Sequence, residues 1–200
     1  VSYNIYPKWY HNTPVAMYLD DLYKWVQTTG GAGKPFLITE VGAGAIYGYR
    51  TPAKVKWSEE YQVLALEEQL GAILSYKDCS GVYIWQFCDV RVTNDWWNTR
   101  PRTMNNKGIV DEYRRPKLSY ETVKRECAPL YISSIKAINT DDNSDERTSG
   151  VEIVIANKNA LPCYEAKGYH LAGFDGAGCL ISYTTLEPLK PGETQKIFLA

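Results

Sequence analysis

The chain has almost no net charge and no long hydrophobic run. Its 22 Lys and Arg residues balance 23 Asp and Glu residues, so the formal net charge is −1. This balance predicts no polyanion partner and no electrostatic attraction to a membrane surface. No apolar run approaches the ~20 residues that a membrane-spanning helix needs. We therefore expect a globular chain with neither a nucleic-acid partner nor a membrane.

Cysteine and histidine are also scarce. The five cysteines are an odd number without a Cys-x-x-Cys pair, which indicates neither a disulfide framework nor a zinc site. They mildly favour a reducing compartment such as the cytoplasm. The two histidines, His11 and His170, form no metal-binding pattern, and we expect no cofactor. Val1 stands where an initiator Met would be and no signal sequence follows it, which suggests processing or a fragment and leaves the native location open.

Aromatic residues are abundant, with 16 tyrosines and six tryptophans. Aromatic rings with polar tips suit carbohydrate, because the C–H faces of a sugar stack on rings while its hydroxyls take hydrogen bonds. Core packing uses the same residues, so the composition alone leaves both interpretations open.

The first two thirds of the chain alternate between strand-like and helix-like patterns. We expect strands at residues 1–6, 35–39 and 81–87, and helices at residues 14–26, 55–76 and 116–125. This alternation predicts an α/β fold with parallel strands and crossover helices. Three such units cannot close a (β/α)8 barrel, so they are the C-terminal portion of a TIM barrel or an open three-stranded piece.

The pattern changes near Cys127, and we place a domain boundary between residues 127 and 128. Short strands separated by Asn, Asp, Gly and Pro clusters are expected at residues 130–138, 151–155, 169–174, 179–186 and 195–199. They predict an immunoglobulin-like antiparallel β-sandwich over residues 128–200. Residues 143–150 are expected to be a solvated loop.

Glu40 is the first candidate catalytic residue. It directly follows the apolar run 36–38 and precedes Gly42. The carboxyl ends of parallel strands are where ligands bind, so a carboxylate at this place is a candidate catalytic group. The alternative is a glutamate that simply pairs with a neighbouring Lys or Arg.

The other expected strands also end in aromatic and polar side chains. Asn4, Tyr6 and Tyr10 lie at or just after the end of the first strand, and Trp85 lies near the end of the third. Strand ends that converge on one edge form a concave site, here with aromatic walls. The loop after Trp85 adds basic and amide groups, namely Arg91, Arg100, Arg102, Asn105, Asn106 and Lys107. This combination suits a substrate that carries hydroxyls and a negative charge.

Five stretches in order resemble the C-terminal part of glycoside hydrolase family 2, and within it the β-glucuronidases most closely. They are Asn4-Ile-Tyr-Pro-Lys-Trp-Tyr10, Ile38-Thr-Glu-Val-Gly42, Trp57-Ser-Glu-Glu-Tyr-Gln62, Val82-Tyr-Ile-Trp-Gln-Phe87, and Asn105-Asn-Lys-Gly-Ile109 with Arg115-Pro-Lys117. Together they cover residues 1 to about 126. The resemblance implies that residues 1–127 are the last strands and helices of a TIM barrel.

The resemblance also implies that Glu40 is the nucleophile of a retaining glycosidase. Such an enzyme needs one ionised carboxylate to attack the anomeric carbon and a second carboxyl group ~5 Å away as acid and base. In this family the second group belongs to an Asn-Glu pair, and the sequence contains none. We therefore expect the acid/base and the remaining barrel strands outside this chain, and the chain alone to be inactive.

Other site residues follow from the same resemblance. Tyr6 and Tyr10 match groups that line the sugar subsite, and Tyr6 is placed to donate a hydrogen bond to Glu40. Trp85 matches the tryptophan that floors the subsite. Asn4 is a weaker candidate, because an Asn at a strand end often only closes a turn.

Asn105 and Lys107 form the Asn-x-Lys pattern with which β-glucuronidases hold the substrate's C6 carboxylate. An ammonium and an amide two residues apart can point at one anion, which a neutral galactoside does not require. The pattern therefore favours a β-glucuronide substrate. The family tends to place an arginine just before this motif, whereas here Pro101 separates Arg100 from Arg102, and either arginine is a substitute.

Two other functions remain open at this point. The first is a family 2 β-galactosidase or related exo-glycosidase that uses Lys107 differently. The second is a carbohydrate-binding or interaction module in which residues 128–200 bind glycan, with Tyr164, Tyr169 and Phe174 as candidate contacts. An open barrel piece also exposes strand edges, so association of copies is expected. Glu59 and Glu60 lie on an expected helix and are interpreted as structural.

Overall fold

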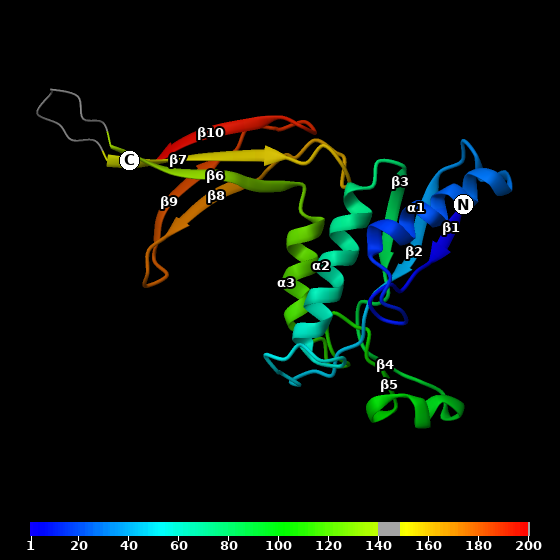
Figure 1. Ribbon diagram of the computed structural model, residues 1–200. Coiled ribbons are helices and arrows are strands. Elements are labelled where there is room, and N and C mark those ends of the chain that lie inside the picture. The colour runs from blue at the N-terminus through cyan, green and yellow to red at the C-terminus, as the bar shows by residue number, and fades with distance from the viewer. Residues whose placement is uncertain (140–148, 200) are drawn as a thin grey trace, which may run out of the picture. The chain divides into compact units, whose positions relative to one another are not determined.

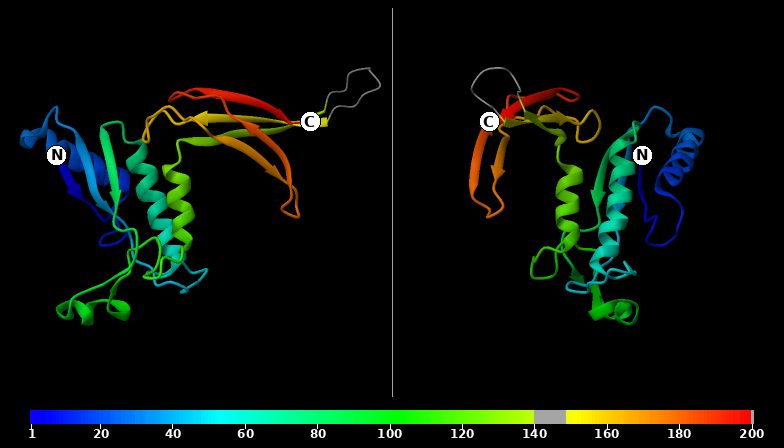
Figure 2. Two further views of the ribbon diagram at one scale, coloured as in Figure 1. Left: turned by 180° about the vertical axis from the view of Figure 1, so that it is seen from behind. Right: turned by 60° about the vertical axis from the view of Figure 1, so that its left-hand side comes forward.

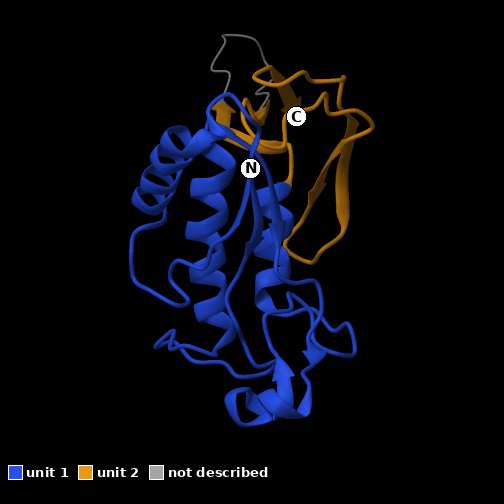
Figure 3. Ribbon diagram, turned by 90° about the vertical axis from the view of Figure 1, so that its right-hand side faces the viewer, with its two compact units in different colours: residues 1–127 blue, residues 128–200 orange. Residues whose placement is uncertain are grey.

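The computed structural model describes residues 1–139 and 149–199, which divide into two compact units, Val1–Cys127 and Ala128–Ala200 (Figure 3). The change of pattern along the sequence falls at the same place. Most of the loop expected at residues 143–150 lies outside the described residues, and its last two residues belong to a strand.

The first unit is built on a three-stranded parallel sheet of β1 (Ser2–Asn4), β2 (Phe36–Val41) and β3 (Cys79–Ile84), in that order. Helix α1 (Val15–Val26) connects β1 to β2, and α2 (Glu59–Ser75) connects β2 to β3 (Figure 1). Helix α3 (Leu118–Cys127) follows and runs beside α2 in the views of Figure 2. The strand-helix alternation thus produces the predicted parallel arrangement.

The core of this unit lies where the sheet meets its helices. Phe36 and Ile38 of β2 are completely buried, whereas Leu37 between them is only partly buried. Leu19 of α1 and Leu70 of α2 are also completely buried, as their helical spacing in the sequence predicts. No helix among the described residues is long and apolar enough to cross a membrane.

The boundaries of α2, β2 and β3 are among those that differ from the sequence prediction. Helix α2 begins at Glu59 rather than near residue 55, because the Ser58 hydroxyl accepts a hydrogen bond from the Tyr61 amide and caps the helix there. Strand β2 extends through Glu40 to Val41. Strand β3 begins at Cys79 and ends at Ile84, so Trp85 follows the strand instead of lying within it.

The long connection from β3 to α3 contains short elements that the sequence did not indicate. A two-stranded antiparallel ribbon pairs β4 (Val90–Arg91) with β5 (Met104–Asn105), and two 3-10 turns, η2 (Asn94–Thr99) and η3 (Pro101–Thr103), lie between them. A further irregular turn, η1 (Gln27–Gly31), follows α1. The ribbon carries Asn105 at its end.

The second unit contains two antiparallel sheets. One has the strand order β10-β7-β6, and the other pairs β8 with β9. The bounds are β6 (Leu130–Asn139), β7 (Ser149–Asn157), β8 (His170–Phe174), β9 (Leu180–Thr185) and β10 (Thr194–Leu199). Its core is the buried cluster Ile153, Ile155, Leu186, Leu189 and Ile197. The predicted strands and their antiparallel pairing are present.

Candidate active site

Glu40 lies near the carboxyl end of β2, the central strand of the parallel sheet, next to an irregularity in the strand pairing. Tyr3 pairs with Ile38 and Asn4 with Glu40, so β2 has one residue more than β1 over this stretch. The pairing with β3 shows the same extra residue, because Ile38 and Val41 face Val82 and Ile84. Ile38 and Val41 are both completely buried although they are an odd number of residues apart, and Glu40 is only half-buried. The bulge therefore keeps the carboxylate off the apolar face of the strand.

Tyr6 holds this carboxylate. Its hydroxyl donates a short hydrogen bond to the Glu40 Oε2 atom, as expected from the sequence. Burial, together with this bond and the nearby negative charge, raises the pKa of Tyr6 well above its usual value. The phenol is therefore protonated at any physiological pH and acts only as a donor to Glu40.

Lys107 reaches the same place from the loop after β5. Its Nζ atom donates a hydrogen bond to the Tyr10 hydroxyl at 3.1 Å, and it lies 5.3, 5.3 and 5.1 Å from the ring centres of Tyr6, Trp9 and Tyr10. Only 4% of Lys107 is exposed, and it makes no ion pair with any residue that the structure describes. Burial lowers its pKa, and Tyr10 and Glu40 only partly oppose this effect. The ammonium thus lacks a full counter-charge.

Arg100 adds a second positive charge at this site. Burial alone would raise the pKa of Tyr10, but hydrogen bonds and charge from Lys107 and then Arg100 lower it. Arg102 instead pairs with Glu112 at 2.8 Å. Of the two arginines that the sequence left open, Arg100 is therefore the one beside Tyr10 and Lys107.

A backbone hydrogen bond joins Trp85 to the end of β2, the strand that carries Glu40. The Trp85 amide donates to the carbonyl of Val41, the residue after Glu40, at 2.8 Å, and the Trp85–Gln86 peptide bond is cis. A Cβ atom on Gly42 would lie 2.2 Å from the Trp85 carbonyl oxygen, so only glycine fits there. Trp85 is 38% exposed and borders a shallow pocket of about 670 Å³ with Val1, Ser2, Leu37, Thr39, Tyr83 and Ile84. This ring is thus available to a ligand.

The two asparagines have more local roles. Asn4 pairs with Glu40 across the strands, and its Oδ1 atom accepts a hydrogen bond from the Thr39 hydroxyl at 2.9 Å. The Asn105 Oδ1 atom accepts from the Lys107 amide at 3.3 Å and so shapes the loop that carries Lys107. Direct contacts therefore join Glu40, Tyr6, Tyr10 and Lys107, and Asn4 and Asn105 lie at the margin.

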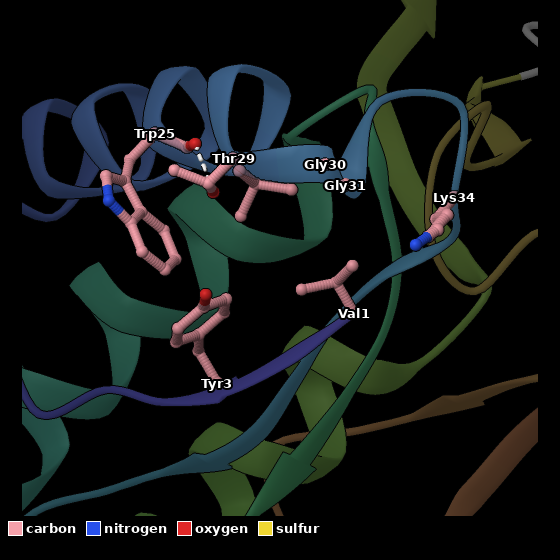
Figure 4. Close-up of a pocket in the computed structure, with 8 residues that line it drawn as sticks. Val1, Tyr3, Trp25, Thr29, Gly30, Gly31 and Lys34 are labelled. Atoms are coloured by element: carbon pink, nitrogen blue, oxygen red, sulfur yellow. Dashed lines mark hydrogen bonds between the residues drawn. The ribbon is translucent and has the colours of Figure 1, made fainter.

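A second pocket of about 320 Å³ lies away from these residues, where the strands begin. It is lined by Val1, Tyr3, Trp25, Val26, Thr29, Gly30, Gly31 and Lys34 (Figure 4). The Thr29 hydroxyl donates to the Trp25 carbonyl at 2.7 Å within it. It contains no carboxylate, and no group of three or more metal-ligating side chains occurs among residues 1–139 and 149–199. The strand-end cluster around Glu40 is therefore the candidate active site.

Comparisons with known proteins identify the class of proteins to which this chain is related. No family model matches the chain. The chain is 75% identical to the crystal structure of a glycoside hydrolase family 2 β-galacturonidase from Eisenbergiella tayi with bound galacturonate, with a TM-score of 0.62 over 63% of this chain and 23% of that one. It is also 32% identical over 129 residues to β-glucuronidase from Felis catus, which covers 58% of this chain and 18% of the cat protein.

A third likeness points the same way. The structure of β-glucuronidase from Ruminococcus gnavus in complex with D-glucuronic acid is 27% identical, with a TM-score of 0.54 over 62% of this chain and 22% of that one. The chain thus spans about a fifth of the length of these relatives. It is related to glycosidases. More particularly, it resembles part of the family 2 β-glucuronidases and of a family 2 β-galacturonidase.

Proposed function

We propose that this chain carries the nucleophile and the carboxylate-binding group of a retaining glycoside hydrolase that releases terminal β-linked hexuronic acids. Glu40 attacks the anomeric carbon, and the bond to the aglycone oxygen breaks as a second carboxylic acid protonates that oxygen. Water then hydrolyses the glycosyl ester and returns Glu40 as a carboxylate. The sequence contains no Asn-Glu pair, and we assign the acid/base to a part of the protein beyond these 200 residues.

The buried ammonium of Lys107, which makes no ion pair with a described residue, carries this proposal. A positive charge in an apolar surrounding is costly, and a substrate carboxylate at hydrogen-bond distance would offset that cost. Arg100 adds a second positive charge near Tyr10. Glu40 belongs to the same cluster, because Tyr6 donates to it and Lys107 donates to the neighbouring Tyr10. A neutral galactoside would offer neither charge a carboxylate partner, which argues against the β-galactosidase alternative.

The sugar itself is proposed from the comparisons. Galacturonic and glucuronic acid carry the same C6 carboxylate and differ only in the orientation of the C4 hydroxyl, so Lys107 serves both. The 75% identity to the β-galacturonidase far exceeds the identity to either β-glucuronidase. We therefore favour a β-galacturonide over the β-glucuronide that the sequence motifs suggested.

The same relationship supports a finer description of the fold. We propose that residues 1–127 are the last three strand-helix units of a TIM barrel, with Glu40 and Trp85 at the carboxyl ends of their strands. We further propose that residues 128–200 form an immunoglobulin-like β-sandwich, to which β6, β7 and β10 contribute one sheet and β8 and β9 the other. The first unit holds the proposed chemistry.

A covalent-trapping experiment tests the reaction. The intact protein is incubated with a 2-fluoro uronosyl fluoride, whose fluorine slows hydrolysis of the covalent intermediate, and the peptides are analysed by mass spectrometry. We expect one uronosyl adduct, on the peptide that contains Glu40. Glu40→Gln should abolish it, and Glu121→Gln, which changes an exposed carboxylate of α3, should retain it. An adduct on another residue would refute the assignment.

Substrate turnover tests the specificity. The initial rates of hydrolysis of aryl β-galacturonide, aryl β-glucuronide and aryl β-galactoside by the intact protein are compared. We expect the galacturonide to be hydrolysed fastest and the neutral galactoside slowest. A preference for the neutral galactoside would remove the role given to Lys107.

A further inference from the structure

Backbone hydrogen bonds connect the segment 106–108, which carries Lys107, to a neighbouring loop on each side. On one side the Ala45 amide, in the loop after β2, donates to the Asn106 carbonyl at 2.8 Å. On the other side the Gln86 amide, in the loop after β3, donates to the Lys107 carbonyl at 3.0 Å. The segment thus lies between the loop that follows β2, the strand of Glu40, and the loop that follows β3 and begins at Trp85.

Lys117 connects the same three loops through its side chain. Its Nζ atom donates to the Ala45 carbonyl at 2.7 Å, to Asp89 Oδ1 at 2.8 Å and to the Asn106 carbonyl at 3.2 Å. The side chain is completely buried. An ammonium has three N–H donors, and all three are used here. Lys117 therefore has no donor left for a ligand, and its contacts are entirely internal.

Asp89 fixes the residues on either side of Lys107. Its Oδ1 atom accepts from the Gly108 amide at 2.9 Å, and its Oδ2 atom accepts from the Asn106 side-chain amide at 3.3 Å. A Cβ atom on Gly108 would lie 2.3 Å from the Asp89 amide nitrogen, so the two backbones are in direct contact. The carboxylate, its side chain fully buried, thus holds the backbone immediately before and after Lys107.

A side chain of helix α2 also hydrogen-bonds to the loop after β2 and to the segment 106–108. The Gln62 Nε2 atom donates to the Ala43 carbonyl at 2.8 Å and to the Gly108 carbonyl at 3.0 Å, and Gln62 Oε1 accepts from the Ser119 hydroxyl at 2.7 Å. All of these side chains are buried. A buried polar network with these partners fixes one arrangement of the loops, because any shift leaves groups unpaired.

We propose that Lys117 and Asp89 are positioning residues that hold Lys107 at the substrate-carboxylate site and in register with Glu40. This inference rests on the proposed function for the identity of the ligand, whereas the positioning of the loop is a property of the fold. The pair acts through the Asn106 and Gly108 backbone and touches no substrate. A displacement of Lys107 by about 1 Å would weaken transition-state binding by up to about a hundredfold.

The main test separates positioning from general stability by using two substrates. Lys117→Met removes the ammonium at similar length, and Asp89→Asn/Lys117→Met also removes the charge that would be left unpaired. In the intact protein we expect kcat/KM on an aryl β-uronide to fall about tenfold to a hundredfold. The low kcat/KM on an aryl β-galactoside, which has no carboxylate, should change much less. Lys124→Met, an exposed lysine of α3, is the matched control.

A double-mutant cycle adds the link to Lys107. In a Lys107→Met background, Lys117→Met should reduce uronide turnover only slightly further, because the group that it positions is already absent. Equal losses on both substrates, or full additivity with Lys107→Met, would overturn the proposal. Failure of both the single and the double variant to fold would also overturn it, since the pair would then serve global stability.

Hydrogen exchange tests the positioning independently of activity. Deuterium uptake of peptides covering residues 104–110 should increase in the Asp89→Asn/Lys117→Met protein and not in Lys124→Met. If wild-type protein hydrolyses no uronide but this local change occurs, the proposed function fails and the positioning role stands. If uronide is hydrolysed and exchange of this segment is unchanged, the positioning role fails alone.

Discussion

Two buried lysines ten residues apart have opposite surroundings in the first unit. Lys107 and Lys117 are 4% and 2% exposed, and burial lowers the pKa of both ammonium groups. Lys117 donates to a carboxylate and two carbonyls, and Asp89 is 2.8 Å away. Lys107 donates to the Tyr10 hydroxyl and lies against the rings of Tyr6, Trp9 and Tyr10, and it makes no ion pair with a described residue.

We propose that this difference distinguishes a structural charge, Lys117, from a charge that binds substrate, Lys107. A buried lysine with a complete set of acceptors stabilises the loops that supply them, and its removal leaves a buried aspartate without a partner. A buried lysine without a counter-ion contributes little to the fold and is ready to bind an anion. Substitutions at the two positions should therefore affect different properties of the protein.

The largest effect should come from Glu40, because the role proposed for Lys107 depends on a reaction at that carboxylate. Glu40→Gln removes the proposed nucleophile and keeps the side-chain volume, so kcat on an aryl β-uronide should fall by roughly a thousandfold or more in the intact protein. Steady-state kinetics with Glu121→Gln as control measures this. Retention of most activity would show that Lys107 serves another site.

The next effect concerns the folding stability of Lys117→Met. Loss of the ammonium leaves Asp89 buried and unpaired, which should lower the free energy of unfolding by about 3–5 kcal/mol. Urea denaturation followed by tryptophan fluorescence measures the change. Adding Asp89→Asn should restore part of the loss, because the uncompensated charge is then removed. An unchanged midpoint in the single variant would contradict the structural role of this pair.

Lys107→Met should act on substrate binding instead. We expect kcat/KM on an aryl β-uronide to fall about a hundredfold, roughly 2.7 kcal/mol, because the substrate carboxylate loses its charged partner. Turnover of an aryl β-galactoside should change little. Similar losses on both substrates would mean that Lys107 does not contact the carboxylate.

The Tyr6 hydroxyl should have a smaller effect on the same reaction. Tyr6→Phe removes the donor to Glu40 and keeps the ring beside Lys107, so kcat should fall about tenfold, the effect of one hydrogen bond to a charged group. Single-turnover kinetics isolates the attack step. Tyr18→Phe is a matched control for the loss of a phenol, because Tyr18 lies in α1 and stacks on His11.

The smallest effect is the stability of Lys107→Met as a function of pH. Because the folded-state pKa of Lys107 is lowered from 10.5, the cost of burying its charge is fully present at neutral pH. It is relieved as pH rises through the folded-state pKa towards 10.5. The variant should therefore be more stable than wild type by on the order of 1 kcal/mol at pH 7, and the gain should shrink at alkaline pH. A loss of stability at pH 7 would contradict this contrast with Lys117.

Long periodic segments were predictable from the sequence, and their ends were not. Helix α1 matches its prediction closely, since its apolar spacing is regular and a run of glycines follows. Helix α2 starts late because the Ser58 side chain, rather than apolar spacing, decides its first residue. The ribbon of β4 and β5 has strands of two residues each, too short for any periodicity to show.

The candidate site followed the same rule. The position of Glu40 near the end of its strand and its hydrogen bond to Tyr6 were predictable, because residue types at strand ends and an ordered set of motifs indicate them. The choice between Arg100 and Arg102 depends on the ion pair of Arg102 with Glu112, which leaves Arg100 as the arginine beside Tyr10, and no residue pattern encodes this pairing. The lack of an ion pair at Lys107 among the residues that the structure describes, and the Lys117–Asp89 pair, are properties of three loops together, so only the folded arrangement reveals them.

The bulge in β2 has a consequence for sequence alignment and for protein engineering. In a regular strand, Glu40 would share the face of Phe36 and Ile38 and lie in the apolar core against the helices, where an ionised carboxylate is unstable. One extra residue between Ile38 and Val41 prevents this. An alignment gap, or a deletion, of a single residue in this stretch would therefore exchange a core position for that of the proposed nucleophile, even though every motif residue was still present.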